Sequence, residues 1–344
     1  MFTVKKLTST KFEDIAQANP KIFIPIEQSP EYDEYDRIMG GRQLLGIYGY
    51  YHDDQLVATT RLTYFTLRMR NILLCVKGPV WFTEQTAERE EELVDTMKDY
   101  FVNEEKLNIT FIRMWLTHQV SGANESFEQF LADREIWVDI NPKHYPDEES
   151  LMLTFSKTTR QNIRKGLRNE ELEIKEITDL DERVNLFDTD LMSIMNETQS
   201  RNNFYAHPKE IYQALLKALP DKAKLFVAYL SGEAVAWEII TEYHGLATYL
   251  FSATNEAARK NRVTYPMLYT AILSSREQGN TLCNLTGIES PKYPGLKNVT
   301  EFKRGFSKWE VDLPLTYDIP IKKSQYLFAV KALGASRKLK SLRN

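Results

Sequence analysis

The order of predicted strands and helices occurs twice in this chain, and this repetition constrains the fold more than any single motif. In the first half, apolar runs predict three strands and helical spacing predicts one helix. These are the strands Val57 to Arg61, Ile72 to Val76 and Ile109 to Leu116, and the helix Thr83 to Lys106. The second half has helices over 151 to 169, 181 to 197 and 208 to 218, the strands Leu172 to Ile177, Lys224 to Leu230, Ala234 to Thr241, Gly245 to Ser252 and Leu282 to Leu285, and the helix Tyr265 to Glu277. We therefore predict an α+β chain made of two copies of one module, with a boundary near residue 150.

The composition excludes several classes of protein. The chain has 344 residues and a net charge of −4, so it has no general affinity for nucleic acid and we expect no stable DNA binding. Cys75 and Cys283 lie in apolar runs, which indicates core thiols in a reducing compartment. We find no N-terminal apolar signal segment and no run near the roughly 18 apolar residues of a membrane span. These observations predict a cytoplasmic protein, which we expect to be a monomer.

The helix over 151 to 169 carries a row of cations. Lys157, Arg160, Arg164 and Arg168 follow one another at spacings of three, four and four, so they share a face. Such a row is often only the solvated face of an amphipathic helix. Because no acidic residue interrupts it, the row also suits an anion-facing surface for phosphates or RNA, with Lys157, Arg160 and Arg164 as the contacts.

A second cationic stretch is Thr300 to Phe306, in which Phe302 and Phe306 flank Lys303. The aromatic neighbours predict an apolar environment for the lysine stem, and a partly desolvated ammonium is a strong partner for a developing oxyanion. Phe302 offers a ring on which a base could stack. The alternative is an edge-strand lysine between two core aromatics.

Arg201 and Tyr205 lie four residues apart in a segment that links two predicted helices. Both could reach one anion, Arg201 through its guanidinium and Tyr205 through its hydroxyl. The alternative is a surface loop with an incidental arginine.

Common catalytic and cofactor motifs are missing from the sequence. The five histidines are scattered, so no metal site is expected, and we find no nucleophile elbow and no glycine-rich phosphate loop. The strand that ends at Ser252 is followed by Ala253 to Lys260, which has no glycine. Enzymes that use acetyl-CoA need close backbone approach to pyrophosphate there, so this segment argues against acetyl-CoA, and we expect no cofactor.

Four stretches resemble the Fem aminoacyltransferases, the tRNA-dependent enzymes that build peptidoglycan bridges. They are Lys77 to Val80, Arg160 to Gly166, Tyr249 to Ala253 with Arg259 to Asn261, and Tyr293 to Phe306. They follow the family order between about residues 28 and 317. The resemblance implies two GNAT-like domains packed together, residues 1–150 with 318–344 and residues 151–317. No heptad pattern lies between 170 and 225, so the chain is similar to compact FemX-like members without a coiled-coil arm.

The resemblance also implies roles for single residues. Phe302 and Lys303 match the pair that meets the 3′ adenosine of aminoacyl-tRNA, with Lys303 as the catalytic cation. Arg201, Tyr205 and Tyr249 match contacts to the UDP-sugar diphosphate or peptide; Arg37 is a weaker match, with Arg42 as its competitor. Two positions depart from the family pattern: Phe251 replaces a second tyrosine and Trp115 replaces a candidate acidic base.

The resemblance implies a reaction as well. An amine on the third residue of UDP-MurNAc-pentapeptide would attack the ester of aminoacyl-tRNA, in the synthesis of peptidoglycan cross-bridges. Three alternatives stay open: the same chemistry on lipid II, an acyl-CoA-dependent N-acyltransferase, and a non-catalytic RNA-binding or immunity protein. The basic end Arg337 to Arg343 could give peripheral membrane contact, or it is a solvated terminus.

Overall fold

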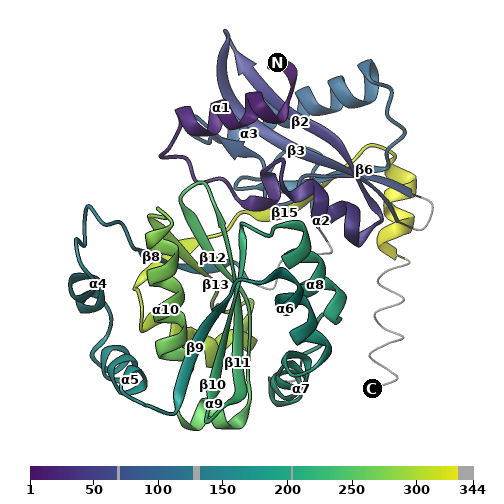
Figure 1. Cartoon of the computed structure of the whole chain (residues 1–344). Coiled ribbons are helices and arrows are strands. Elements are labelled where there is room, and N and C mark those ends of the chain that lie inside the picture. The colour runs from purple at the N-terminus through teal and green to yellow at the C-terminus, as the bar shows by residue number, and fades with distance from the viewer. Residues whose placement is uncertain (68–69, 127–131, 203, 332–344) are drawn as a thin grey trace. The chain divides into compact units, whose positions relative to one another are not determined.

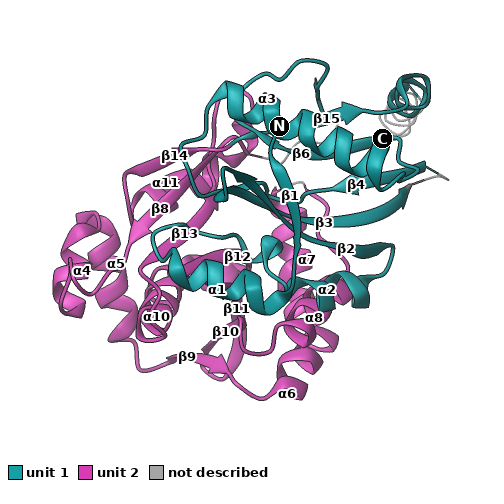
Figure 2. Cartoon of the chain, turned by 90° about the horizontal axis from the view of Figure 1, so that it is seen from above, with its two compact units in different colours: residues 1–130, 314–344 teal, residues 131–313 magenta. Residues whose placement is uncertain are grey.

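The computed structural model describes residues 1–67, 70–126, 132–202 and 204–331, and the chain divides into two compact units (Figure 2). Unit 1 consists of residues 1–130 and 314–344, and unit 2 of residues 131–313. The predicted boundary near residue 150 falls inside unit 2, because strand β8 (Arg134–Asp139) pairs with two strands of that unit. The chain returns to unit 1 at residue 314, since β15 (Leu315–Pro320) pairs with β6 (Phe111–Leu116).

Unit 1 is built on a mixed sheet of strand order β1-β2-β3-β4-β6-β15-β7, with β5 paired to β3. Its remaining elements are β1 (Thr3–Leu7), α1 (Ser9–Ala18), η1 (Ile26–Gln28), α2 (Tyr32–Met39), β2 (Arg42–His52), β3 (Gln55–Leu67), β4 (Arg70–Leu74), β5 (Val80–Trp81), α3 (Ala87–Lys98), η2 (Asp99–Glu104) and β7 (Asn124–Glu125). Strands β4 and β6 are parallel, whereas the other strand pairs among the described residues of this sheet are antiparallel. The apolar face of α3, with Leu93, Val94 and Met97, packs on the core of this sheet.

Unit 2 repeats this plan with strand order β14-β8-β13-β12-β11-β10-β9. Its elements after β8 are α4 (Glu148–Thr154), α5 (Lys157–Leu167), β9 (Leu172–Ile177), α6 (Leu180–Asn185), η3 (Leu186–Asp188), α7 (Leu191–Asn202), α8 (Lys209–Ala218), β10 (Ala223–Leu230), β11 (Glu233–Tyr243), β12 (Leu246–Thr254), α9 (Glu256–Lys260), α10 (Thr264–Glu277), β13 (Leu282–Gly287), η4 (Pro294–Leu296), α11 (Lys297–Arg304) and β14 (Trp309–Asp312). Strands β12 and β13 are its parallel pair, and α9 and α10 form the crossover between them. One parallel pair in each sheet confirms that the two halves share one module.

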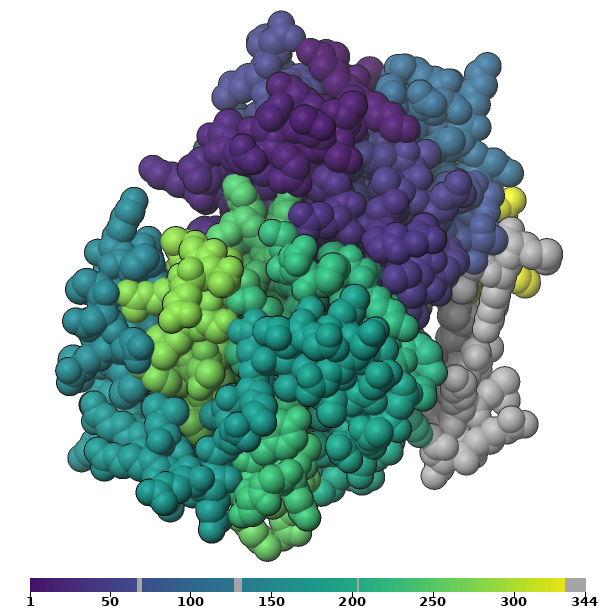
Figure 3. All heavy atoms as spheres, viewed as in Figure 1, coloured from purple at the N-terminus to yellow at the C-terminus, as the bar shows by residue number. Residues whose placement is uncertain are grey.

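The sheet of unit 2 is covered on both faces (Figure 1). Helices α5 and α10 pack on one face, where Ile163, Phe226 and Leu268 belong to one core cluster. The other face meets α8 and η3, and there the rings of Phe187, Tyr212 and Trp237 pack with centroids 5.1–5.3 Å apart. Side chains fill the spaces between the ribbons of this unit (Figure 3). The central strands β10 to β13 are therefore buried on both faces, which explains their nearly continuous apolar sequences.

Local sequence signals set several of these elements. The predicted hairpin turn has two residues, Ser231 and Gly232, with φ of 50° and 86°, the positive values that a type I′ turn needs. The helix predicted over 151 to 169 is two helices, α4 and α5. The break occurs because Phe155 is extended and the Ser156 hydroxyl caps α5, accepting from the Thr159 amide at 3.2 Å. Between β9 and β10, the longest helix among the described residues is α7, with 12 residues, too short for a coiled-coil arm.

Candidate functional site

A cavity of about 680 Å³ in unit 2 is the candidate site, and its volume is within the usual range for ligand sites. It lies where β12 diverges from β13, since those strands pair only through Leu246 to Thr248 and Leu282 to Asn284. The residues that line it come from α7 and the segment after it, β12, α9, α10 with the connection between them, and α11: Thr198, Arg201, Asn202, Phe204, Tyr249, Ser252, Ala253, Thr254, Arg259, Lys260, Arg262, Thr264, Tyr265, Asn298, Val299 and Phe302. The structure thus brings together three residues predicted from the sequence: Arg201, Tyr249 and Phe302.

A β-bulge shapes the wall that β12 gives to this cavity. Ile239 pairs with Phe251 while its neighbour Ile240 pairs with Tyr249, so Leu250 is an extra residue in β12. In a regular strand, Tyr249 and Ser252 would point to opposite faces. The bulge returns both to the cavity side, whereas Phe251 packs on the opposite face against Tyr212, 5.0 Å between ring centroids.

Arg201 is fixed at the end of α7 by two hydrogen bonds to one residue of β12. Its Nη1 donates to the Thr254 carbonyl at 3.0 Å and its Nη2 to the Thr254 hydroxyl at 3.2 Å. Burial and the neighbouring Arg259 lower the pKa of Arg201, but an arginine stays charged at any physiological pH. The remaining guanidinium donors can face an anion in the cavity.

Three more cations line the cavity: Arg259 and Lys260 from the end of α9, and Arg262 from the α9–α10 connection. Arg259 pairs with Glu197 at 3.6 Å and Lys260 with Glu256 at 2.8 Å. Arg262 has a φ of 56°, a left-handed conformation that is uncommon for a side chain of its size. The lining of described residues contains four cations and no carboxylate, so the cavity suits a phosphate-bearing ligand.

Phe302 and Lys303 lie on α11, so the edge-strand alternative is wrong. Residues 297–304 form a helix because Val299, Phe302 and Phe306 recur at helical spacing and the last two rings pack together, 5.3 Å between centroids. The Phe302 ring also packs against Tyr265 at 5.1 Å and lines the cavity. Neighbours on a helix point about 100° apart, so Lys303 is not among the described lining residues.

The ammonium of Lys303 is buried against the end of β13. Its Nζ donates to the Gly287 carbonyl at 2.6 Å and to the Thr286 hydroxyl at 3.2 Å, and the residue is only 6 % exposed. The pKa of Lys303 is lowered to about 8, because the effect of burial exceeds the opposing effect of the nearby Glu135. A lysine with this pKa is still mostly cationic at neutral pH, but it titrates in the range where enzymes work.

The turn that holds Lys303 is itself braced. Thr286 has a φ of 63°, which is rare for a β-branched residue, and its amide donates to the Asn284 side chain at 2.7 Å. The same side chain donates to the buried Glu135 at 2.6 Å. Strain of this kind is often found at functional sites, and here it sets the direction of the groups that accept from Lys303.

The cations of α5 differ in their surroundings. Lys157 and Arg164 are exposed, while Nη1 of Arg160 donates to the backbone carbonyls of Phe155 at 2.7 Å and Leu153 at 3.1 Å. Arg160 is therefore partly engaged in holding the α4–α5 junction. The start of α5 is tied to the end of α11, since the Ser156 amide donates to the Gly305 carbonyl at 2.8 Å. The basic helix and the helix of Lys303 thus form one connected element.

The structure does not place two predicted anion contacts in the cavity. Tyr205 is 86 % exposed and is not among the described lining residues. Arg37 lies on α2 of unit 1, where it is exposed and pairs with Glu34, its Nε 2.8 Å from the carboxylate. Its competitor Arg42 pairs with Asp36 at 3.3 Å. The basic end Arg337 to Arg343 lies outside the described residues.

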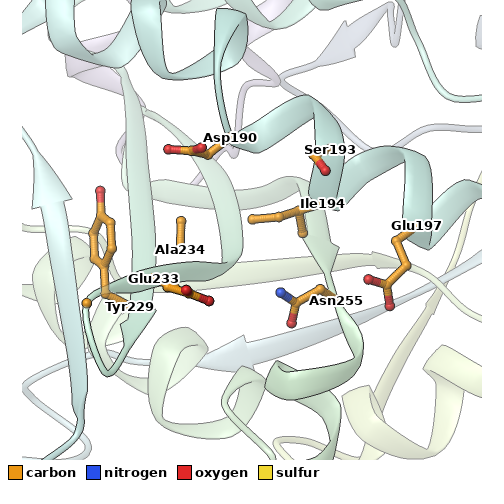
Figure 4. A pocket seen from close by; sticks show the side chains of 9 residues that line it. Asp190, Ser193, Ile194, Glu197, Tyr229, Glu233, Ala234 and Asn255 are labelled. Carbon is orange, nitrogen blue, oxygen red and sulfur yellow. The ribbon is translucent and has the colours of Figure 1, made fainter.

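A second cavity of unit 2, of about 440 Å³, has the opposite charge (Figure 4). Asp190, Glu197 and Glu233 line it, and Figure 4 shows these carboxylates around Tyr229 and Asn255. This lining would repel phosphate groups. Within the described part of the chain, no group of three or more acidic, histidine or cysteine side chains could hold a metal ion, and no helix is long and apolar enough to cross a membrane.

Comparisons with known proteins agree with this architecture. Residues 154–304 match the acetyltransferase (GNAT) domain family. The crystal structure of FemX has the same fold: its TM-score is 0.75 at 13 % identity, and the match covers 95 % of this chain and 99 % of that chain. No curated protein sequence gives a significant match.

Two further structures are similar over most of their length. A conserved protein of unknown function from Bacteroides thetaiotaomicron has a TM-score of 0.53 at 13 % identity, covering 92 % of this chain and 99 % of that one. The C-terminal domain of a putative lysylphosphatidylglycerol synthetase from Agrobacterium fabrum has a TM-score of 0.50 at 12 % identity, covering 94 % and 95 %. The predicted class, α+β with two GNAT-like domains, is confirmed, and the resemblance to FemX is confirmed at the level of the fold. The domain match supports an acyltransferase.

Sequence reasoning missed Glu238, Thr286 and Arg262. Glu238 had a signal, since it is the single charge inside the apolar run Ala234 to Ile240 of β11. The left-handed backbone of Thr286 and Arg262 has no signature in residue type.

Proposed function

We propose that this chain is a FemX-like aminoacyltransferase of the cytoplasm. It would transfer an amino acid from aminoacyl-tRNA to the side-chain amine of the third residue of UDP-MurNAc-pentapeptide, for peptidoglycan cross-bridges. The observation that carries this proposal is the cation-lined cavity that joins Arg201, Tyr249 and Phe302 beside the Lys303 helix. The resemblance implies that Phe302 binds the donor, and that Arg201 and Tyr249 bind the acceptor. One cavity could therefore bring the two substrates together.

The donor end would be held by aromatic and cationic groups. Phe302 supplies a ring for the terminal adenine, a contact worth roughly 1–3 kcal/mol. Lys157 and Arg164 on α5 are exposed and could follow the phosphates of the tRNA, while Arg160 has fewer free donors because two carbonyls already use it. The hydrogen bond between Ser156 and Gly305 would hold the cations of α5 at a fixed position relative to Phe302 on α11.

The acceptor would be held by its diphosphate. Arg201 is preorganised by Thr254 and faces the cavity, so it is the strongest candidate contact, with Tyr249 beside it. Tyr205 is exposed and could close onto the ligand from the segment after α7. Arg37 would first have to leave Glu34, which makes its role the weakest of this set.

Lys303 would stabilise charge during aminolysis. The amine attacks the ester carbonyl, the C–N bond forms, and the ester C–O bond breaks as the ribose oxygen leaves and takes up a proton. Two of the three N–H donors of Lys303 are held by Gly287 and Thr286. The third would have to reach the developing oxyanion or the ribose oxygen from behind the described lining of the cavity. The side-chain ammonium of the acceptor must lose a proton before its nitrogen can attack, and a phosphate of the substrate could accept that proton.

The direct test is to incubate the full chain with UDP-MurNAc-pentapeptide and a pool of charged tRNAs, and to measure the product mass. A mass increase of one aminoacyl residue supports the proposal and identifies the amino acid. Parallel reactions with uncharged tRNA, with acetyl-CoA, and with lipid II in place of the soluble precursor separate the alternatives. Binding of tRNA without turnover on either acceptor would instead indicate a non-catalytic RNA-binding protein.

A further inference from the structure

Glu238 is a buried carboxyl group that the proposed reaction does not use. It lies on β11, is 0 % exposed, and neither of its oxygens has a hydrogen-bond partner in the part of the chain that the structure describes. Other buried carboxylates have polar or cationic partners: Asp36, Glu90, Glu135 and Asp318. Because a buried carboxyl without a partner costs free energy, Glu238 calls for an explanation beyond packing.

The position of Glu238 is directly behind the wall of the cavity. Its partner in the antiparallel ladder is Ser252, so the two side chains share a face of the sheet. Tyr249 reaches that same face because of the bulge at Leu250, and its hydroxyl bonds to Ser252. Both Ser252 and Tyr249 line the cavity. The carboxyl group is thus separated from the cavity by two hydroxyl-bearing side chains.

Among the residues that the structure describes, no positive charge acts on Glu238. Tyr249 on β12 and Cys283 on β13 are the titratable groups that act on it, and burial raises the pKa of both, which keeps them neutral. Phe226 is its apolar partner on β10, and α10 contributes Leu268 to the same core. Burial accordingly raises the pKa of Glu238 well above its usual value, so the carboxyl is neutral until a cation approaches.

The cavity has four cations for a phosphate but no carboxylate for an ammonium. The 3′ end of an aminoacyl-tRNA carries both a phosphate and an α-ammonium, whereas an acetyl or other simple acyl donor has no ammonium. We infer that Glu238 is the counter-charge for the α-ammonium of the donor, and that it makes the cavity selective for aminoacyl over simple acyl groups. This inference rests on the proposed function and names the chemical group by which its donor is recognised.

Binding of such a donor has a measurable consequence. The ammonium would lie at the hydroxyls of Ser252 and Tyr249, and its field would favour the ionised form of Glu238. The carboxyl would then release a proton to solvent as the ligand binds. A donor without the amine would bind with no such release.

The test uses two stable analogues of the donor end: 3′-amino-3′-deoxyadenosine joined through an amide to alanine, or to a propionyl group. Calorimetry near pH 7, in buffers of different ionisation enthalpy, gives both the affinity and the number of protons released. The variants are Glu238→Gln, which keeps the shape of the side chain, and Glu238→Met, which removes the buried polar group. The methionine variant should fold even if a buried amide without a partner prevents the glutamine variant from folding. The control is Glu242→Gln, on the same strand but paired with Lys224 at 3.3 Å.

We expect the wild type to bind the alanyl analogue at least about tenfold more tightly than the propionyl one, and to release a proton only with the former. Both Glu238 variants should lose this preference and the proton release, whereas Glu242→Gln should keep them. Equal affinities in the wild type, or a preference that survives in both Glu238 variants, would overturn the inference and leave the proposed function standing. If neither analogue binds, the proposed donor site fails and this inference fails with it.

Discussion

Replacing Lys303 with methionine should separate catalysis from stability. The pKa of Lys303 falls from 10.5 to about 8, so carrying its charge in the buried site costs about 3 kcal/mol. Methionine removes that cost but leaves the Gly287 carbonyl and the Thr286 hydroxyl without their donor, which costs about 1–3 kcal/mol. We therefore expect the free energy of unfolding to change by less than about 2 kcal/mol, in the stabilising direction if it changes at all.

The same substitution should lower kcat at least about a hundredfold, since a lost oxyanion donor costs roughly 3–4 kcal/mol in the transition state. The assay is product formation from charged tRNA, with urea unfolding of the same protein and calorimetry of the sugar nucleotide, whose affinity should be unchanged. Lys297→Met, an exposed lysine at the start of α11, is the matched control and should behave as the wild type. Near-normal turnover of Lys303→Met would refute the catalytic role, and a loss of several kcal/mol of stability would show that the lysine is structural.

The pH dependence follows from the same residue and has a defined sign. The protonated form stabilises the oxyanion, so turnover should fall as the pH rises through about 8, and this limb should be absent from the residual activity of Lys303→Met. Stability should move the other way. Between pH 8 and 10.5 the unfolded chain holds more protons than the folded one, so the free energy of unfolding contributed by Lys303 should increase with pH. A turnover limb that persists in the variant would assign the titration to another group.

Three further predictions concern the rest of unit 2. Arg201→Ala should weaken sugar-nucleotide binding at least about tenfold by calorimetry, and unchanged affinity would refute its role. Lys157→Ala with Arg164→Ala should weaken aminoacyl-tRNA binding and reduce the slope of log affinity against log salt by about one per lost phosphate contact, while leaving a short donor analogue unaffected. Gly166→Ala should destabilise the chain by about 1–3 kcal/mol in urea unfolding, because its Cβ would lie 2.5 Å from Pro266 Cγ where α5 meets α10; equal stability would show that the helices can move apart.

Much of the fold could be predicted because its signals are local. The hairpin at Ser231 and Gly232 and the strand positions follow from turn chemistry and apolar runs. The unit boundary could not, because it depends on β8 pairing with β13 and β14, more than a hundred residues away in the chain. The polar turns around residue 146 were the strongest local signal of a domain boundary. The pairing of β8 in the sheet nevertheless determines that it belongs to unit 2.

Three residues that line the cavity, Arg201, Tyr249 and Phe302, were predicted from the sequence, but the geometry of the site was not, and β12 shows why. Period-two alternation would put Tyr249 and Phe251 on one face of the strand and Ser252 on the other. The extra residue Leu250 reverses this: it directs Phe251 into the opposite core and puts Tyr249 and Ser252 together in front of Glu238. A bulge of this kind is a property of strand pairing, and no residue type in β12 predicts it. It follows that Phe251, where the resemblance to the Fem enzymes implies a second tyrosine, removes no hydroxyl from this cavity. The polar wall of the site is set by the backbone register as much as by the residues themselves.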